Sequence, residues 1–337
     1  MKIVFVAGGS GGHIYPAIAI AQALKKRAAA TQVVFFTSRR ELVFFNGNAF
    51  TGFWPMLNQL IKNRPDYMVN MGGVIGGVAA VAAYLLRIPM LTHECNIVAG
   101  RATRFTGRLS RTVTVPVKDT LRYFGPKAVV TGNPVRSSIG KIERVAAARQ
   151  LQIDPQRFTV LILGGSQGAL KLNVLIPELV RILPHNFQYL HITGSRDYEA
   201  IKNKSVAAIP AALRQNYFIY PFVADPALLY AAADMAVSRA GAGALAELAA
   251  AGVPAILVPY PHAADNHQEI NARRFKAADA AELVSNRELS VERLSSIIKS
   301  WAASPQKLTD MRAKSLALDK PEAASRIADI IYKGIKA

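Results

Sequence analysis

Short apolar runs alternate with glycine-containing turns and amphipathic stretches along the whole chain. Continuous apolar runs of about four to eight residues, bounded by turn signals, are typical of strands buried on both faces of a sheet. These runs predict strands at residues 3–7, 33–37, 67–70, 88–92, 112–115 and 128–130, and again at 159–163, 189–193, 217–220, 235–238 and 255–259. With helical patterns between them, they predict an α/β fold of two doubly wound, Rossmann-like halves that face each other across a cleft.

The boundary between the halves is expected near Asn133-Pro134, because Asn-Pro favours a turn. A chain of 337 residues is also long for a single core. The final helical stretch carries Ile327, Ile330 and Ile331 on one face, which favours its packing back onto the first half. We therefore expect an N-terminal domain of residues 1–135 completed by 320–337, and a C-terminal domain of residues 136–319.

The stretch 238–268 carries the most informative chemistry. It combines a strand end, a turn containing Gly241 and Gly243, and a helix that Gly252 ends. Glycines let the backbone approach a ligand closely, and a helix N-terminus offers N–H groups and a positive dipole end, so this turn suits a pyrophosphate. Glu247, about one turn into the helix, suits a ribose diol. The alternative for Glu247 is an acid that only complements the helix dipole.

A second glycine turn, GGSGGH, follows the first strand and opens a helix. Strand, turn and helix again form a corner suited to phosphate, although the spacing is not GxGxxG. His13 stands where this helix begins, and a neutral imidazole there suits a general base. The alternative is a histidine that caps or packs the helix. Glu94 follows the strand at 88–92, at the end where open α/β sheets bind ligands, and is a weaker candidate base.

Composition narrows the range of partners. Hydrophobic residues make up 51% and charged residues 19% of the chain, which is typical of a packed globular protein. Lys and Arg outnumber Asp and Glu by 41 to 22, a formal charge of +19, so an anionic partner is expected. No nucleic-acid recognition motif occurs, and nucleic acid is not expected as a partner. Cys95 is the only cysteine, which excludes an internal disulfide and fits a reducing compartment.

Two stretches bear on membranes, whereas no secretory signal is visible at the N-terminus. Residues 67–86 carry no charge over a length able to span a bilayer, but Asn70 and four glycines divide them into a strand, a turn and a helix of small residues. Residues 42–61 form a loop-like segment, which suits either an interfacial membrane patch or a small core under a loop. The aromatic and basic residues in and around it include Phe44, Phe45, Phe50, Phe53 and Trp54, with Arg39, Arg40, Lys62 and Arg64.

Seven short motifs together resemble the MurG family of glycosyltransferases. In chain order they are GGSGGHIYPAIAIAQAL, NMGG, HECNIVAG, TGNPVR, GGSQGALKLN, SRAGAGALAE and PYPHAADNHQEINA. The family moves N-acetylglucosamine (GlcNAc) from UDP-GlcNAc to undecaprenyl-linked lipid I, which gives lipid II for peptidoglycan synthesis. The resemblance implies a GT-B fold, inverting transfer without a metal or other cofactor, and peripheral attachment to the cytoplasmic face of the inner membrane. The implied partners are UDP-GlcNAc, lipid I and an anionic membrane surface.

In the first half and at its boundary with the second, the resemblance assigns substrate contacts to three motifs. Ser10, Gly11 and Gly12 match the first glycine loop, which lies near the phosphates in the family. Asn96 matches the asparagine of the family's HEQN motif, and Arg136 matches the arginine of GNPVR. These five residues are therefore expected to bind substrate.

In the second half, the resemblance assigns the donor site. Ser166 matches the serine of GGSQGA, close to the donor diphosphate. Val223 takes the place of the residue whose backbone meets uracil, and Gln268 matches the glutamine that faces the donor sugar. The segment that ends in the ribose-binding glutamate comprises Ala242, Gly243, Ala244, Leu245, Ala246 and Glu247.

The sequence also departs from the family pattern. Cys95 replaces the glutamine of HEQN, and Ala244 stands where the family often has a small polar residue that reaches phosphate. The segment between Thr37 and Pro65 is much shorter than in typical members, and it includes positions that face the acceptor and the membrane. Two alternatives stay open: another GT-B enzyme, such as a glycolipid synthase or nucleotide-sugar epimerase, and a non-catalytic UDP-sugar-binding membrane scaffold.

Overall fold

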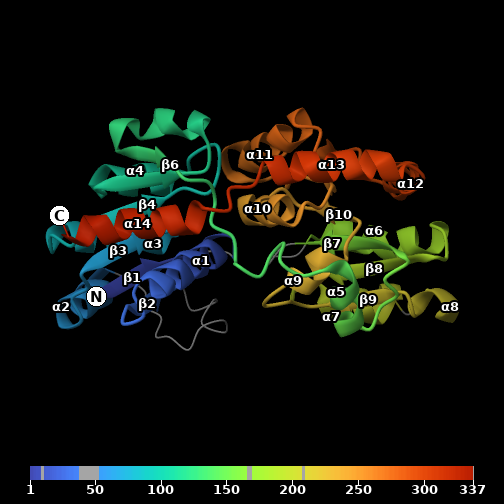
Figure 1. The fold of residues 1–337 in the computed structure, drawn as a ribbon, viewed down its shortest axis with the longest axis horizontal. Helices are drawn as coiled ribbons and strands as arrows, with labels where there is room; N and C mark the ends of the chain where they lie inside the picture. The colour runs from blue at the N-terminus through green and yellow to red at the C-terminus, as the bar shows by residue number, and fades with distance from the viewer. Residues whose placement is uncertain (9–10, 38–52, 165–168, 207–208, 337) are drawn as a thin grey trace. The chain divides into compact units, whose positions relative to one another are not determined.

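The computed structural model describes residues 1–8, 11–37, 53–164, 169–206 and 209–336. The chain divides into two units, an N-terminal unit of Met1–Arg136 with Lys320–Ala337 and a C-terminal unit of Ser137–Asp319 (Figure 1). Each unit is built on one parallel sheet of six strands. Arg136, expected as the first residue of the C-terminal domain, lies in the N-terminal unit.

The sheet of the N-terminal unit has the strand order β2-β1-β3-β4-β5-β6, with every neighbouring pair parallel. The order reverses between β1 and β3, and such a switch point is where open α/β sheets bind ligands. The elements of this unit are β1 (Lys2–Val6), α1 (Gly11–Arg27), β2 (Gln32–Phe36), α2 (Phe53–Lys62), β3 (Tyr67–Asn70), α3 (Gly73–Leu85), β4 (Met90–His93), α4 (Arg101–Leu109), β5 (Thr112–Val115), η2 (Lys118–Tyr123), η3 (Gly125–Lys127), β6 (Ala128–Val130) and α14 (Ala323–Lys336).

Alternate residues of the central strand β1 face opposite layers of helices. Ile3 and Phe5 belong to a buried cluster with α1 and with Ile327 of α14. Val4 and Val6 belong to a second cluster with α2 and the alanines of α3. Helices therefore cover both faces of the sheet, which explains why its strands read as continuous apolar runs.

Helix α2 corrects the expectation of a loop-like segment over residues 42–61. It buries Met56 and Leu60, which lie one turn apart, and leaves Trp54 exposed. Pro55 is tolerated because it stands in the first turn, where a backbone N–H has no intrahelical partner. The rest of the segment, with Arg39, Arg40, Phe44, Phe45 and Phe50, lies outside the described residues.

Residues 67–86, long enough to span a bilayer, form β3 and α3 instead. The amide of Asn70 joins the two elements: its Nδ2 donates to the Gly76 carbonyl at 2.7 Å and its Oδ1 accepts from the Gly72 N–H at 2.8 Å. A Cβ on Gly76 would come within 2.5 Å of that Oδ1, so glycine is needed there. The glycine-rich stretch therefore lies mostly in the helix rather than in the expected turn. Within the described residues, no helix is long and apolar enough to cross a membrane.

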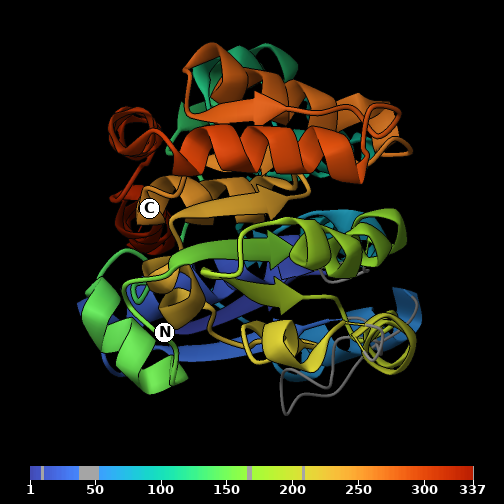
Figure 2. The same ribbon diagram turned by 90° about the vertical axis from the view of Figure 1, so that its right-hand side faces the viewer.

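The C-terminal unit contains the sheet β12-β11-β10-β7-β8-β9, again parallel throughout. In Figure 2 its strands follow one another from orange β12 to yellow-green β9. The order reverses between β7 and β10. The elements are α5 (Arg144–Leu151), β7 (Phe158–Leu163), α6 (Leu170–Ile182), β8 (Phe187–Ile192), α7 (Tyr198–Ala200), η4 (Ile201–Val206), α8 (Ala211–Arg214), β9 (Tyr217–Tyr220), α9 (Ala227–Ala232), β10 (Met235–Ser238), α10 (Ala242–Ala251), β11 (Ala255–Leu257), η5 (Ala264–Asn266), α11 (His267–Ala277), β12 (Ala281–Leu283), α12 (Val291–Ala302) and α13 (Pro305–Ala317).

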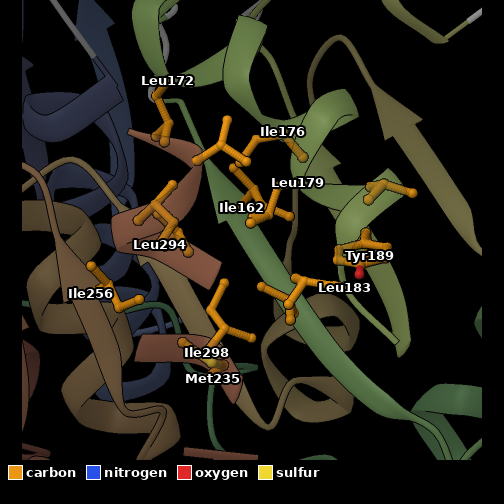
Figure 3. Packing of buried hydrophobic residues seen from close by; sticks show 14 of the residues in the cluster. Ile162, Leu172, Ile176, Leu179, Leu183, Tyr189, Met235, Ile256, Leu294 and Ile298 are labelled. Carbon is orange, nitrogen blue, oxygen red and sulfur yellow. The ribbon is translucent and has the colours of Figure 1, made fainter. Parts of the chain in front are cut away.

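One face of this second sheet is held by α6 and α12. Ile162, Met235 and Ile256, from three neighbouring strands, share a buried cluster with Ile176 of α6 and Ile298 of α12 (Figure 3). Full burial of an aliphatic side chain contributes about 1.5–3 kcal/mol. The cluster therefore holds β7, β10 and β11 firmly and fixes where their carboxyl ends lie.

The expectation of two doubly wound α/β halves is confirmed. The polar residues that follow the expected strand at 255–259 suggest a loop as far as Gln268, but the stretch after β11 is not a loop throughout. The short turn η5 leads into α11, which begins at His267 and contains Gln268 in its first turn. Asp265 and Asn266 take left-handed backbone angles at this junction, with φ of 50° and 52°, which Asp and Asn adopt more readily than most residues.

Candidate functional site

The strand ends of the N-terminal unit bring three separate segments together. The Sγ atom of Cys95, after β4, lies 3.8 Å from the carbonyl oxygen of Gly12 in the first turn of α1. Asn133, after β6, donates its amide to the Cys95 carbonyl at 2.8 Å. The glycine turn, the HECN loop and the TGNP segment therefore meet at one edge of the sheet, as the parallel strand order requires.

His13 is the third residue of α1 and is half-buried. Its Nδ1 lies 2.7 Å from the carbonyl oxygen of Gly8. A carbonyl only accepts, so Nδ1 must carry the proton, and in the neutral ring Nε2 keeps the lone pair that can take a proton from a substrate. The same bond also supports the turn before the helix, so a structural role and a role as a base are compatible.

A second histidine, His93, lies fully buried at the end of β4. Its Nδ1 pairs with Thr114 Oγ1 at 2.9 Å, whereas among the described residues neither its Nε2 nor the Oδ1 of Asn133 has a hydrogen-bond partner. Burial lowers the pKa of His93 to about 4; the Asn133 side chain opposes this shift and the nearby His13 adds to it. His93 is therefore neutral at pH 7. Because His93 is fully buried and His13 is only half-buried, His13 is better suited to receive a proton from a substrate.

The carboxylate of Glu94 is almost fully buried and is surrounded by donors from its own loop. It accepts from the N–H and the Nδ2 of Asn96, at 2.8 and 3.1 Å, and from the Gly100 N–H at 2.8 Å. The hydroxyl of Thr103 also donates to it. Because Gly100 precedes α4, these bonds tie the HECN loop to the start of that helix, which gives Glu94 a structural task.

Arg136 is nearly buried after β6, and its guanidinium carbon lies 4.1 Å from the ring centroid of Tyr15 on α1. Such a cation–π contact holds the guanidinium plane in place. Tyr15 was not identified from the sequence, since only the order of the strands brings the TGNPVR motif to α1. Gly11 begins α1, whereas Ser10 lies outside the described residues.

In the C-terminal unit, the N-terminus of α10 is open at the switch point between β7 and β10. Within the described part of the chain, no side chain caps this helix, and its first turn contains no acid. Gly241 precedes it with an ordinary φ of −67°, and a Cβ there would meet no atom of the described residues within 4 Å. Among the described residues, neither backbone strain nor packing requires this glycine, and its missing side chain lets a ligand approach the start of the helix closely.

Glu247 is the sixth residue of α10, beyond the first turn in which an acid complements the helix dipole. Its Oε2 accepts a hydrogen bond of 3.0 Å from the hydroxyl of Tyr230, which is buried on α9. The residues of the motif before it, Ala242 to Ala246, form the start of the same helix. Tyr230 was missed from the sequence, although a tyrosine in the otherwise apolar helix ALLYAA is a signal that could have shown it.

The remaining candidates follow β9 and β11. Val223 is half-buried between β9 and α9. Gln268 accepts a hydrogen bond from the Tyr260 N–H at 2.9 Å through its Oε1. Ser166 lies outside the described residues. In the parts of the chain that are described, no group of three or more His, Cys, Asp or Glu side chains is arranged to hold a metal ion.

Comparison with known proteins identifies the family. Residues 3–45 and 47–115 match the glycosyltransferase family 28 N-terminal domain, and residues 159–328 match its C-terminal domain. The chain is 33% identical over 362 residues to the UDP-N-acetylglucosamine–N-acetylmuramyl-(pentapeptide) pyrophosphoryl-undecaprenol N-acetylglucosamine transferase of Caldanaerobacter subterraneus subsp. tengcongensis, covering 98% of this chain and 99% of that protein. This chain belongs to the MurG family.

Solved structures agree with this membership. The crystal structure of Acinetobacter baumannii MurG is 28% identical, with a TM-score of 0.74 over 99% of this chain and 100% of that one. S. aureus MnaA, solved with UDP, reaches the same TM-score over 99% of this chain and 97% of its own at only 12% identity. The second likeness shows the fold alone, so the distinction within GT-B enzymes comes from the sequence relatives of the MurG family.

Proposed function

We propose that this protein transfers GlcNAc from UDP-GlcNAc to undecaprenyl-pyrophosphoryl-MurNAc-pentapeptide, converting lipid I to lipid II with inversion at the anomeric carbon. The observation that carries this function is its 33% identity, over 98% of the chain, to a transferase named for this reaction. The strand-end groups of both units supply the chemistry that the reaction needs.

The donor binds to the C-terminal unit. Among the described residues no side chain caps α10 or packs against Gly241, and this helix start suits the diphosphate of UDP because helix N–H groups stabilise its charge without a metal. Glu247 binds the ribose diol, and its hydrogen bond from Tyr230 supports this role by fixing the carboxylate. The backbone at Val223 meets uracil, and Gln268 faces the sugar. Ser166 adds a diphosphate contact.

The acceptor hydroxyl is activated in the N-terminal unit, where His13 is the base. The fixed Nδ1–H of His13 supports this assignment because it leaves Nε2 ready to accept a proton. Glu94 is the weaker candidate, since donors of its own loop already surround its carboxylate. Arg136 and Asn96 bind substrate, together with the glycine turn Ser10–Gly12.

The reaction is then a single displacement. The acceptor oxygen attacks the anomeric carbon from the face opposite UDP while its proton passes to Nε2 of His13. The bond between that carbon and the diphosphate oxygen breaks, and UDP leaves with the electron pair. The N-terminus of α10 and Arg136 stabilise the charge of the leaving UDP.

Incubation of the protein with radiolabelled UDP-GlcNAc and a lipid I analogue tests this function. With the label in the GlcNAc, we expect labelled lipid product and unlabelled UDP to form in equal amounts. The reaction should not require a divalent metal. Isomerised UDP-sugar without lipid product would indicate an epimerase. Donor binding without any turnover would indicate the non-catalytic scaffold.

The membrane contact belongs to α2, α3 and α4, which pack side by side in the N-terminal unit (Figure 1). These helices expose large apolar side chains: Trp54 and Ile61 on α2, Val74, Tyr84 and Leu85 on α3, and Phe105 on α4. Arg101 and Arg108 are exposed on one side of α4, and within the described residues neither forms an ion pair. Arg104 between them is held by the protein, because it donates to the Ala99 carbonyl at 2.9 Å and lies over the ring of Tyr123. Apolar side chains beside unpaired cations support peripheral binding to the anionic cytoplasmic leaflet of the inner membrane.

A further inference from the structure

We propose that Arg239 is a positioning residue for Gln268. Through Gln268 it increases the affinity for UDP-GlcNAc relative to the affinity for UDP. The inference rests on the proposed function, because the contact between Gln268 and the donor sugar is assigned there. It concerns a side chain that the family motifs leave without a role.

Arg239 directly follows β10 and joins three strand ends. Its Nη1 donates to the carbonyl oxygens of Val258 and Pro259, at 3.1 and 3.2 Å, and to Oδ1 of Asn286 at 3.2 Å. Val258 and Pro259 follow β11, and Asn286 follows β12. One guanidinium therefore fixes the spacing between the segments that leave three neighbouring strands.

The segment that Arg239 holds is the one that orients Gln268. The guanidinium carbon lies 5.8 Å from the ring centroid of Tyr260, the next residue along this segment. The N–H of Tyr260 donates to Oε1 of Gln268 at 2.9 Å. Because a backbone N–H can only donate, this bond identifies which end of the Gln268 amide is the oxygen, and it leaves the NH₂ group directed away from the segment. Any shift of residues 258–260 moves the bond that sets this orientation.

The chemistry of Arg239 explains why another side chain cannot replace it. Its guanidinium is half-buried, and among the described residues it is bound by neutral oxygens rather than by a carboxylate. Burial accordingly lowers its pKa. A buried cation without an anionic partner is costly. All three oxygens lie around the single nitrogen Nη1, whose two hydrogens they share, and the planar guanidinium holds that nitrogen in a fixed direction. A lysine ammonium is instead a point charge on a flexible stem.

Calorimetric titration of the full chain with UDP and with UDP-GlcNAc tests the proposal. Arg239→Met and Gln268→Ala should each weaken UDP-GlcNAc about tenfold, the usual loss for a hydrogen bond to a bound group, and change UDP affinity less than about twofold. The double variant should bind UDP-GlcNAc about as tightly as the weaker-binding of the two single variants. The two losses should not add, because both residues act through one contact. Arg239→Lys should fall between wild type and Arg239→Met.

Arg293→Met is the matched control, because this arginine is half-exposed on α12 and pairs with Glu282 at 3.4 Å. It should leave both affinities unchanged. Equal losses for UDP and UDP-GlcNAc in Arg239→Met would overturn the proposal, since they would place Arg239 on the diphosphate itself. Additive losses in the double variant would overturn it as well.

Asn286→Ala keeps the arginine and removes one of its three acceptors, so it provides the same test if Arg239→Met does not fold. A smaller but still sugar-selective loss is expected, and an unchanged ratio of the two affinities would contradict the proposal. A wild-type protein that binds neither nucleotide would instead refute the donor assignment. Normal wild-type binding with unchanged variants removes only the positioning role.

Discussion

The two units share one architecture but differ greatly in charge. The N-terminal unit carries 21 of the 41 Lys and Arg residues and only six of the 22 Asp and Glu residues, a formal +15, which leaves +4 for the C-terminal unit. Both units build a six-stranded parallel sheet, so the fold itself does not require this excess. Charge of one sign on one unit is instead a property of what that unit binds.

A buried histidine near the end of a sheet strand shows the same contrast on a smaller scale. In the C-terminal unit, His191 is fully bonded, with Nδ1 2.6 Å from the Tyr217 hydroxyl and Nε2 3.0 Å from Asn173 Oδ1. In the N-terminal unit, His93 lies beside His13 and keeps a buried Nε2 without a partner among the described residues. Among the described residues, the C-terminal unit satisfies both nitrogens of its buried histidine and leaves the hydroxyl of Tyr189 without a partner, whereas the N-terminal unit leaves the Nε2 of His93 without one, next to the proposed base.

The largest effect that would sharpen this comparison is on turnover. His13→Ala should lower kcat by about a hundredfold or more and change UDP affinity less than about threefold, because general-base catalysis contributes that much and the proposed donor site lies in the other unit. Steady-state kinetics with the lipid I analogue and calorimetry with UDP measure the two quantities. His185→Ala, an exposed histidine of the C-terminal unit, is the control. Near-normal turnover in His13→Ala would remove this residue from the mechanism.

Acid should destabilise both units, through one buried histidine in each. Burial lowers the pKa of His93 to about 4 and that of His191 to about 3, from 6.5 in the unfolded chain. Between pH 6.5 and the folded-state pKa, each histidine is protonated in the unfolded chain but not in the folded one. The free energy of unfolding should therefore fall by about 1.4 kcal/mol per histidine for each unit of pH below 6.5. The fall should continue to about pH 4 for His93 and about pH 3 for His191.

Hydrogen exchange of the buried strand amides of each sheet, in low urea at several pH values, measures these slopes for each unit separately. His93→Gln should flatten the slope of the N-terminal unit, and His191→Gln that of the C-terminal unit. Slopes that do not change in these variants would show that the histidines titrate without cost in the folded state.

Donor affinity should depend on the C-terminal unit alone. Glu247→Ala should weaken UDP-GlcNAc binding by roughly 1–3 kcal/mol, the range for a charged hydrogen-bonding partner. Tyr230→Phe removes only the hydroxyl that holds this carboxylate and should cost about 0.5–1.5 kcal/mol. Calorimetry with UDP-GlcNAc measures both losses. Unchanged affinity in Glu247→Ala would reduce this residue to a structural acid.

The smallest expected effect concerns the membrane and the charge of the N-terminal unit. Arg108→Gln on α4 should weaken sedimentation with anionic vesicles about fivefold, since one basic residue near the surface contributes about 1 kcal/mol. Salt should diminish this loss. Trp54→Ser should also weaken binding, through lost apolar area of a side chain that is 75% exposed, and this loss should persist in salt.

The matched control is Arg181→Gln, an exposed arginine of α6 in the C-terminal unit, which should bind vesicles like the wild type. Equal losses from Arg108→Gln and Arg181→Gln would mean that net charge, rather than the α2–α4 surface, drives attachment. Phe53 is unsuitable for this test because it packs against the core cluster of α2 and α3.

Much of the fold could be predicted from the sequence, because its strands are buried runs closed by turn residues. The expected strands at 67–70, 112–115, 217–220 and 235–238 agree residue for residue with β3, β5, β9 and β10. Helix α2 was missed because Pro55 and Gly52 suggested a loop, although Met56 and Leu60 already had helical spacing. The glycine-rich start of α3 was missed because the contact between Asn70 and Gly76 depends on the folded backbone.

The candidate site could be predicted only as a set of strand ends. Parallel strands place their carboxyl ends at one edge, so the residue types at those ends were readable. The partners of these residues could not be predicted, because they come from other segments of the chain. Tyr230 of α9 donates to Glu247 of α10, and Tyr15 near the N-terminus contacts the guanidinium of Arg136. The proposed role of Arg239 could not be predicted for the same reason, because the acceptors of its hydrogen bonds lie in the loops after two other strands.

The return of α14 to the N-terminal unit has a consequence for synthesis on the ribosome. The face of β1 formed by Ile3 and Phe5 is covered by α1 and by Ile327 of α14, so its cover stays incomplete until the last helix emerges. The intervening C-terminal unit takes on the order of 10–40 s to translate, given its length of about 180 residues and rates of about 5–20 residues per second. The unit that emerges first is therefore the last to be finished. A chain cut short anywhere before α14 would present the part of that apolar face which α14 covers to chaperones and proteases, even with its C-terminal unit fully formed.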